Sequence, residues 1–396
     1  MRKNVFRLTV IAAAIGLVQL APVPMAWSAP ATRTAVVPGA VLRGGAELAF
    51  PASHVGVRWQ GDEEAAVEVR WDGGPWQPVH HNEDMTTGDV VYADLVGVGR
   101  AERVEARVVA GEARDVQVVA IDTRHGPRRL VRAGRSGAPA TASMSDTRVA
   151  QPGVVSRAQW GADESIRNPG PPSFAPVRKL IVHHTDTPNG DPDPAATVRA
   201  IYSYHVQTRG WNDIGYNFLI DERGRIYEGR WSREYAAGEI PTGEDTEGRG
   251  VIGAHAEGAN TGSVGVALLG TFTAQGPSSA AVEALQAMLA WKADRHSINV
   301  LSGDSYPNLA GHRDTKATSC PGDRLYDRLP EIRRRVSDIV ASAHGRTKGY
   351  WVTTNDGQVL PFGEAGSFGS MAGHRLNSPV LGMAATTTHA GYWLLA

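Results

Sequence analysis

The chain has 396 residues, which gives room for two or three domains of ordinary size. Its 40 basic and 41 acidic residues leave a formal net charge of −1, and 20% of all residues are charged, as in an ordinary soluble globular protein. This balance argues against a nucleic-acid partner and against a polybasic surface for anionic membranes.

The N-terminus has the pattern of an export signal. Basic residues among the first seven precede an apolar run over residues 8–21, and small residues follow up to Ala29. This order predicts a signal peptide over residues 1–29. The run is shorter than the ~20 apolar residues that span a bilayer. We therefore expect a secreted or cell-wall-associated protein without stable membrane insertion after the signal is removed.

Residues 36–122 predict a small all-β accessory domain at the N-terminus. Apolar and polar residues alternate over 54–59 and 66–71, and the turn residues 72–75 follow directly. Short alternating runs between turns favour a β-sandwich, whose function the sequence does not reveal. Residues 123–150 are rich in Arg, Gly, Ala, Ser and Thr without periodicity, which predicts a flexible linker.

Residues 153–344 change to a mixed α/β pattern. The apolar run 179–183 predicts a buried strand, and Asp193 followed by Pro194 predicts a helix start. A hairpin is expected over 217–228, around the turn Asp-Glu-Arg-Gly. Further elements are expected as a strand over 264–269 and as helices beginning near 279 and 330. The prediction is a central β-sheet flanked by about three helices.

Residues 349–396 contain a repeat. Gly349-Tyr350-Trp351 recurs 42 residues later as Gly391-Tyr392-Trp393. A period near 40–45 with several short strands predicts a partial propeller-like β repeat. Because one such unit cannot bury a core alone, we expect either a piece of a longer array or a degenerate tail. The fold class predicted for the whole chain is therefore multidomain: an all-β domain, an α/β domain and a β-repeat tail.

Three metal-ligand side chains stand at informative places. Cys320 is the one cysteine of the chain, so an exported protein would contain no internal disulfide. His183 ends the buried strand, and His312 precedes the cysteine by eight residues. Three protein ligands and one open position are the usual pattern of catalytic zinc. From composition alone the group remains open, because a single buried cysteine is more often inert.

Ordered sequence blocks resemble the peptidoglycan recognition protein family, which includes zinc-dependent N-acetylmuramoyl-L-alanine amidases. The resemblance covers residues 153–344, about half of the chain, and its order along the chain makes it specific. The matching blocks are 154–162, 180–185, 210–218, 227–230, 253–256, 260–265, 311–314 and 320–322.

The resemblance implies a zinc ion held by His183, His312 and Cys320. It also places Tyr216 beside the metal, where the alternative is a merely buried aromatic residue, and Thr318 at a position that is lysine or threonine in the family. The implied reaction is hydrolysis of the amide between N-acetylmuramic acid and L-alanine, with bacterial peptidoglycan or muropeptides as substrates. No glutamate in the matching blocks is an obvious general base.

Two alternative functions stay open. Non-catalytic peptidoglycan binders occur in the same family and commonly lack the metal cysteine, so the presence of Cys320 favours the amidase. A structural wall protein with a vestigial central domain is the other alternative, and the intact ligands argue against it. No matching block lies in residues 36–122, which predicts that this domain is dispensable for the chemistry.

Several residues near the expected ligands have more than one interpretation. His184 is expected to face away from the metal, because successive strand residues point to opposite sides. His205 is expected to pack in the core, and His255 either lines the cleft or supports its loop. Asp314 is a candidate hydrogen-bond partner of a ligand histidine. The segment 231–252 is longer than in compact family members and is expected to lie near the groove.

Overall fold

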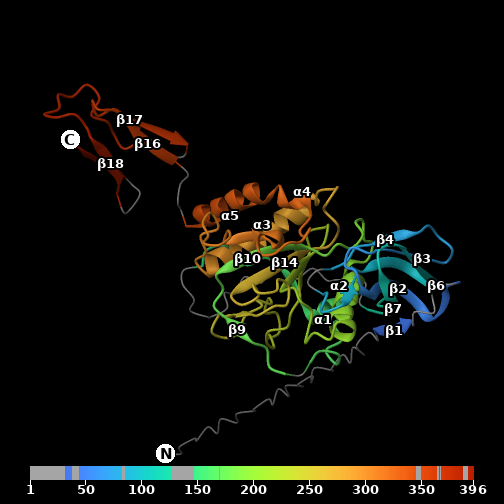
Figure 1. Ribbon diagram of the computed structural model, residues 1–396. Helices are drawn as coiled ribbons and strands as arrows, with labels where there is room; N and C mark the ends of the chain where they lie inside the picture. The colour runs from blue at the N-terminus through green and yellow to red at the C-terminus, as the bar shows by residue number, and fades with distance from the viewer. Residues whose placement is uncertain are drawn as a thin grey trace, which may run out of the picture.

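The structure is a computed structural model. It describes residues 32–37, 44–82, 85–126, 147–168, 170–344, 349–363, 365, 367–386 and 391–396. The predicted signal peptide and most of the predicted linker lie outside the described residues. Figure 1 shows a β-rich part beside a central α/β body, and a small β tail beyond helix α5.

The N-terminal part is built from strands alone within its described residues. Its strands are β1 (Arg33–Val37), β2 (Ala46–Gly61), β3 (Ala66–Trp71), β4 (Gln77–Val79), β5 (Val90–Tyr92), β6 (Val96–Ala110) and β7 (Ala113–Asp122). They form one sheet in the order β1-β7-β2-β6-β3-β4, with β5 also on β2. The long strand β2 pairs with β6 over its first half and with β7 over its second half. The described residues of this part are all-β, as predicted, and β2 links strands β6, β3 and β4 to strands β7 and β1.

The central part contains a six-stranded mixed sheet in the order β15-β10-β14-β11-β12-β8. Its strands are β8 (Val154–Val155), β10 (Lys179–His184), β11 (Phe218–Ile220), β12 (Ile226–Glu228), β14 (Ser263–Leu268) and β15 (Leu309–Gly311), and a separate pair is β9 (Phe174–Ala175) with β13 (Gly250–Val251). Strand β10 runs parallel to both β14 and β15. The β11–β12 hairpin is antiparallel, which confirms the hairpin predicted over 217–228.

Helices cover both faces of this sheet. They are α1 (Arg157–Trp160), α2 (Pro194–Ser203) continued by the π-helical turn η2 (Tyr204–Thr208), α3 (Ser279–Arg295), the 3-10 turn η3 (His312–Asp314), α4 (Asp323–Tyr326) and α5 (Leu329–Ala343). Val182 of β10 belongs to the core formed with α3 and α5, whereas Leu219 of β11 belongs to the core formed with α2. The Asp193 side chain accepts a hydrogen bond from Ala196 N and caps α2, as the sequence predicted. Among the described residues, no helix has the length and hydrophobicity needed to cross a bilayer.

The β-rich part and helix α2 share one hydrophobic core. Met85 and Ile121 pack in the same buried cluster as Val198 and Ile201. The hydroxyl of Tyr204 lies 3.0 Å from Ala93 O, inside the β-rich part. The two units are therefore joined by packed side chains. The sequence prediction of a separable accessory domain overlooked this shared core.

The long segment after β12 is anchored on helix α3. The carboxylate of Glu244 lies 2.5 Å from Lys292 Nζ and 2.6 Å from Arg295 Nε. Burial alone would raise the pKa of Glu244, yet the adjacent cations hold it far below its usual range. The end of the same segment lies close to Tyr216, because the side chain of the adjacent Asn217 donates a hydrogen bond to Val251 O at 2.9 Å.

The C-terminal part forms two separate hairpins. These are β16 (Gly349–Thr353) with β17 (Val359–Gly363), and β18 (Gly382–Ala385) with β19 (Tyr392–Leu395). The Trp351 and Tyr392 rings approach to 5.4 Å, but no strand of one hairpin pairs with the other within the described residues. The repeated motif opens the first strand of one hairpin and the last strand of the other, so the tail contains the predicted short strands, and its assignment to a partial propeller-like repeat stays a prediction.

Glu228, at the end of β12, makes stability depend on pH. Burial raises the pKa of its carboxyl group from 4.5 to about 7, although Arg157 N donates a hydrogen bond to it. The folded state therefore binds more protons than the unfolded state between these values, and stability falls as pH rises through this window. We expect the free energy of unfolding of the wild type to fall by roughly 2 kcal/mol between pH 5 and pH 8 because of this group, and we expect Glu228→Gln to abolish this fall. Urea unfolding at pH 5 and pH 8 measures it; equal pH slopes in both proteins would contradict the assignment.

Candidate metal centre

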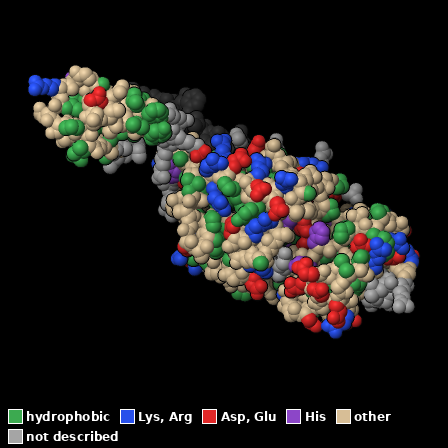
Figure 2. All heavy atoms as spheres, turned by 45° about the horizontal axis from the view of Figure 1, so that its top comes forward, with side chains coloured by type: hydrophobic (Ala, Val, Ile, Leu, Met, Phe, Trp, Pro, Cys, Tyr) green, Lys and Arg blue, Asp and Glu red, His purple; other side chains and the backbone are tan. Residues whose placement is uncertain are grey.

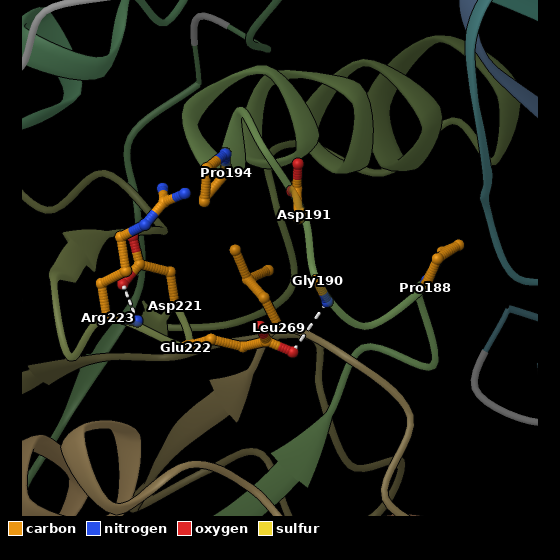
Figure 3. A pocket seen from close by; sticks show the side chains of 8 residues that line it. All are labelled: Pro188, Gly190, Asp191, Pro194, Asp221, Glu222, Arg223 and Leu269. Carbon is orange, nitrogen blue, oxygen red and sulfur yellow. Dashed lines mark hydrogen bonds between the residues drawn. The ribbon is translucent and has the colours of Figure 1, made fainter.

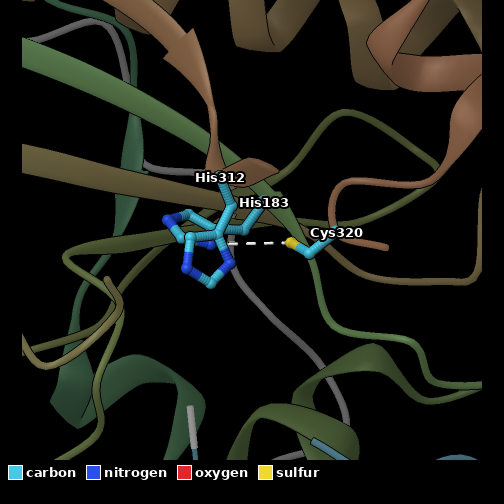
Figure 4. A group of neighbouring side chains, drawn as sticks. All are labelled: His183, His312 and Cys320. Carbon is cyan, nitrogen blue, oxygen red and sulfur yellow. Dashed lines mark hydrogen bonds between the residues drawn. The ribbon is translucent and has the colours of Figure 1, made fainter. Parts of the chain in front are cut away.

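The two predicted ligand histidines are brought together by neighbouring parallel strands. His183 is the next-to-last residue of β10, and His312 follows β15 directly. Cys320 comes from the turn before α4 and completes the group. One ligand atom from each of the three side chains lies within 4.8 Å of the others (Figure 4). Within the group, His183 Nδ1 lies 3.6 Å from Cys320 Sγ.

These three residues fit a zinc ion. Metal–ligand distances of 2.0–2.3 Å in a tetrahedral site put ligand atoms about 3.3–3.8 Å apart, so small side-chain adjustments are sufficient. Burial, and then the neighbouring His312, lower the pKa of His183 well below its usual value. His183 is therefore a neutral imidazole, which is the form that binds metal. Two imidazoles and one thiol are a donor set suited to zinc and unsuited to calcium or magnesium.

The structure separates the other histidines by role. His184 lies outside the ligand group, and its Nδ1 accepts a hydrogen bond from Phe272 N at 3.3 Å, as the alternation of strand residues predicts. His205 is buried and accepts a hydrogen bond from Gly215 N at 3.1 Å. His255 is buried as well, and its ring contacts that of His183 directly.

Tyr216 and Thr318 both lie next to the ligand group. The Tyr216 ring centre is 5.5 Å from that of His183, on the side where His205 also packs. The Thr318 hydroxyl accepts a hydrogen bond from Cys320 N at 3.1 Å. The structure thus gathers all five residues singled out from the sequence.

Asp314 holds the turn that carries His312. One carboxylate oxygen accepts a hydrogen bond from Gly311 N at 2.9 Å, and the other accepts one from the Tyr326 hydroxyl. Both contacts fix the chain on either side of η3. Asp314 therefore supports the backbone of the ligand turn. Its carboxylate bonds to Gly311 N and to the Tyr326 hydroxyl, and not to the imidazole of His312 as the sequence suggested.

Sequence reasoning missed a contribution of the β-rich part to this region. Met85 and Leu95 face Tyr216 across a cavity of about 10 Å³, which leaves space for no more than one water. Nearby, His80 Nδ1 lies 3.2 Å from the carboxylate of Asp186, in the loop that follows β10. Figure 2 shows histidine side chains, in purple, beside acidic ones at the surface between the central body and the β-rich part. No local motif signals this contact.

A second hollow, of about 110 Å³, lies at the β11–β12 turn (Figure 3). Asp221 lines it, but this carboxylate accepts hydrogen bonds from the backbone of Arg223 and Arg225 in its own turn. Gly190 N donates to the carboxylate of Glu222 on the opposite side. The hollow is smaller than the roughly 300–1,000 Å³ of ordinary ligand pockets, and the Asp221 carboxylate that lines it is engaged within the turn.

Parts of the chain are similar to known proteins. The family model described as N-acetylmuramoyl-L-alanine amidase matches residues 173–323. Peptidoglycan recognition protein 1 of Bos taurus is 34% identical over 197 residues, covering 46% of this chain and 86% of that protein. N-acetylmuramoyl-L-alanine amidase of Sus scrofa is 34% identical over 207 residues, covering 50% of this chain. The solved structure of Drosophila PGRP-LB is 31% identical, covers 44% of this chain and 91% of its own, and gives a TM-score of 0.35.

The fold and the site define an α/β domain that gathers two histidines and a cysteine at adjacent strand ends. The chain belongs to the peptidoglycan recognition protein family, in which N-acetylmuramoyl-L-alanine amidases and non-catalytic recognition proteins both occur. The match spans 31% of the length of the porcine amidase, so the resemblance concerns one domain of that protein.

Proposed function

We propose that this protein is a secreted or wall-associated, zinc-dependent N-acetylmuramoyl-L-alanine amidase that acts on bacterial peptidoglycan or muropeptides. The observation that supports the proposal most strongly is the complete His183, His312 and Cys320 group, with its ligand atoms within 4.8 Å. Peptidoglycan recognition protein 1 of Bos taurus is 34% identical over 86% of its own length, and its name supports peptidoglycan as the substrate class.

In the proposed reaction, water adds to the lactyl carbonyl carbon of N-acetylmuramic acid. The bond from this carbon to the alanine nitrogen breaks, which leaves a carboxylate on the sugar and a free amino group on the peptide. Zinc bound to three such ligands supplies a Lewis acid that activates water near neutral pH and polarises a carbonyl. The hydroxyls of Tyr216 and Thr318 are the chain's candidate donors to the oxygen on which negative charge develops.

Product analysis tests the proposal. The purified protein is incubated with peptidoglycan and with soluble muropeptides, and the products are identified by mass spectrometry. An amidase releases stem peptides that begin with a free alanine amino group and leaves the glycan strands uncut. Binding to peptidoglycan without any new amino groups, at full zinc occupancy, would instead identify a recognition protein.

Tyr216→Phe is expected to retain zinc and fold while losing ~10²–10³ in turnover, the usual scale for removing one oxyanion donor. The ring remains for packing against His183 and His205, so only the hydroxyl is tested. Thr318→Val removes the second hydroxyl and is expected to have a similar or milder effect. Turnover and zinc content are measured on the same samples. Normal turnover of Tyr216→Phe at full occupancy would make Tyr216 a packing residue.

A further inference from the structure

His255 contacts the one nitrogen of His183 that faces away from the ligand group. His255 Nδ1 lies 3.0 Å from His183 Nε2, and the two rings meet edge to face at 78°. The opposite nitrogen of His183, Nδ1, is the atom that faces Cys320 Sγ at 3.6 Å. Both histidines are buried, at 0% and 1% exposure, so this contact is protected from water.

The surrounding hydrogen bonds indicate which of the two histidines donates and which accepts in this contact. The Ser263 hydroxyl donates to a backbone carbonyl, with Ala259 O at 2.6 Å and Asn260 O at 3.1 Å. Its oxygen is then the acceptor for His255 Nε2–H at 3.4 Å. A neutral His255 protonated on Nε2 has a lone pair on Nδ1, which accepts a hydrogen bond from His183 Nε2–H. The lone pair of His183 is consequently on Nδ1, toward the cysteine.

The surrounding backbone is shaped to hold the His255 ring. A Cβ atom on Gly253 would lie 2.5 Å from the ring, and one on Gly265 would lie 2.4 Å from it, so neither position has space for a side chain. The Asn260 side chain accepts hydrogen bonds from His255 N and Ala256 N, which fixes the loop. Gly253, Asn260 and Gly265 of the two sequence blocks around His255 thus all help to hold its ring in place.

We propose that His255 is a positioning residue that holds His183 in its Nε2-protonated tautomer and so presents the Nδ1 lone pair to the metal. The inference rests on the proposed zinc site and goes beyond it. A histidine ligand whose other nitrogen is engaged keeps both its tautomer and its ring orientation, and loss of such a partner typically weakens metal affinity by ~10–100-fold. Ser263 acts one step further out, through His255.

Matched variants separate positioning from packing. His255→Leu fills the cavity but offers no acceptor, whereas His255→Asn places Oδ1 close to the position of the lost Nδ1. We expect zinc affinity, measured by competition with a chelator, to fall ~10–100-fold in His255→Leu and to recover for the most part in His255→Asn. Ser263→Ala is expected to weaken zinc less than His255→Leu. Thermal unfolding of the metal-free proteins verifies that each variant is folded.

A second measurement does not depend on metal or activity. Nitrogen-15 NMR of the metal-free protein reports which His183 nitrogen carries the proton, and the inference predicts Nε2–H in the wild type and a mixture in His255→Leu. An Nδ1–H tautomer in the wild type, zinc affinity within twofold of wild type in His255→Leu, or an asparagine variant no better than leucine would each overturn it. Failure of amidase activity alone, with the predicted tautomer present, would overturn only the proposed function.

Discussion

Cys320→Ser is expected to reduce bound zinc from one ion per chain to a trace and to lower amidase turnover by at least ~10³-fold. Cysteine binds zinc as a thiolate, and the serine hydroxyl is a much poorer ligand for this ion. Because the site is buried and the change replaces one atom, the fold should persist. Metal analysis after dialysis and the rate of product release are measured on the same protein.

Ser319→Ala is the matched control for this substitution. It changes the neighbouring residue of the same turn and removes a hydroxyl that is not part of the ligand group. We expect this variant to keep its zinc and its turnover. If Cys320→Ser also retained one zinc per chain with normal turnover, the cysteine would not be a ligand and the assigned site would be wrong.

Removing the β-rich part is expected to unfold or aggregate the remaining chain. A protein that begins at residue 147 would expose Val198, Ile201 and Tyr204, which are buried in the shared core. Each fully buried apolar side chain of this size contributes roughly 1.5–3 kcal/mol, and a whole domain is stable by only about 5–15 kcal/mol. Sedimentation, circular dichroism and urea unfolding measure the result. A monomeric, cooperatively folded and active truncated protein would contradict it.

A point substitution tests the same interface in the full chain. At Gly56 an added Cβ would lie 2.5 Å from the Tyr204 ring, so Gly56→Ala should cost roughly 1–3 kcal/mol through overpacking. Gly97→Ala is the matched control, because its nearest neighbour would be 4.0 Å away. We expect this control to change stability by less than about 0.5 kcal/mol. Equal effects at both positions would show that the interface contributes little.

The sequence was most informative where structure is determined locally. Asp193 before Pro194 marked the start of α2, and the turn after Ile220 marked the β11–β12 hairpin. The ligands His183 and Cys320 were found through ordered blocks, although they are far apart in the chain. Hydrophobic period and turn chemistry act over a few residues, so these features are readable without a fold.

Contacts between distant segments were not readable in the same way. His255 and His183 are 72 residues apart, and the importance of His255 depends on which nitrogen it faces. The contact of the β-rich part with α2 left one signal in the sequence: Arg199 is the one charged residue of Pro194–Ser203, and the structure buries every residue of this helix. A helix with few polar residues packs against other elements on more than one face, but its sequence does not show which elements these are. The repeat at the C-terminus indicated the strands, but a short repeat does not determine which strand each of them pairs with.

Zinc titration of the metal-free protein tests whether this protein is a zinc-dependent amidase. Increasing amounts of zinc are added to a known amount of protein with a soluble muropeptide, and the release of alanine amino groups is followed. We expect the rate to rise linearly up to one zinc per chain and then to stay constant, with Cys320→Ser inactive throughout. A full rate without zinc, or amino groups that never appear although one zinc is bound, would contradict it.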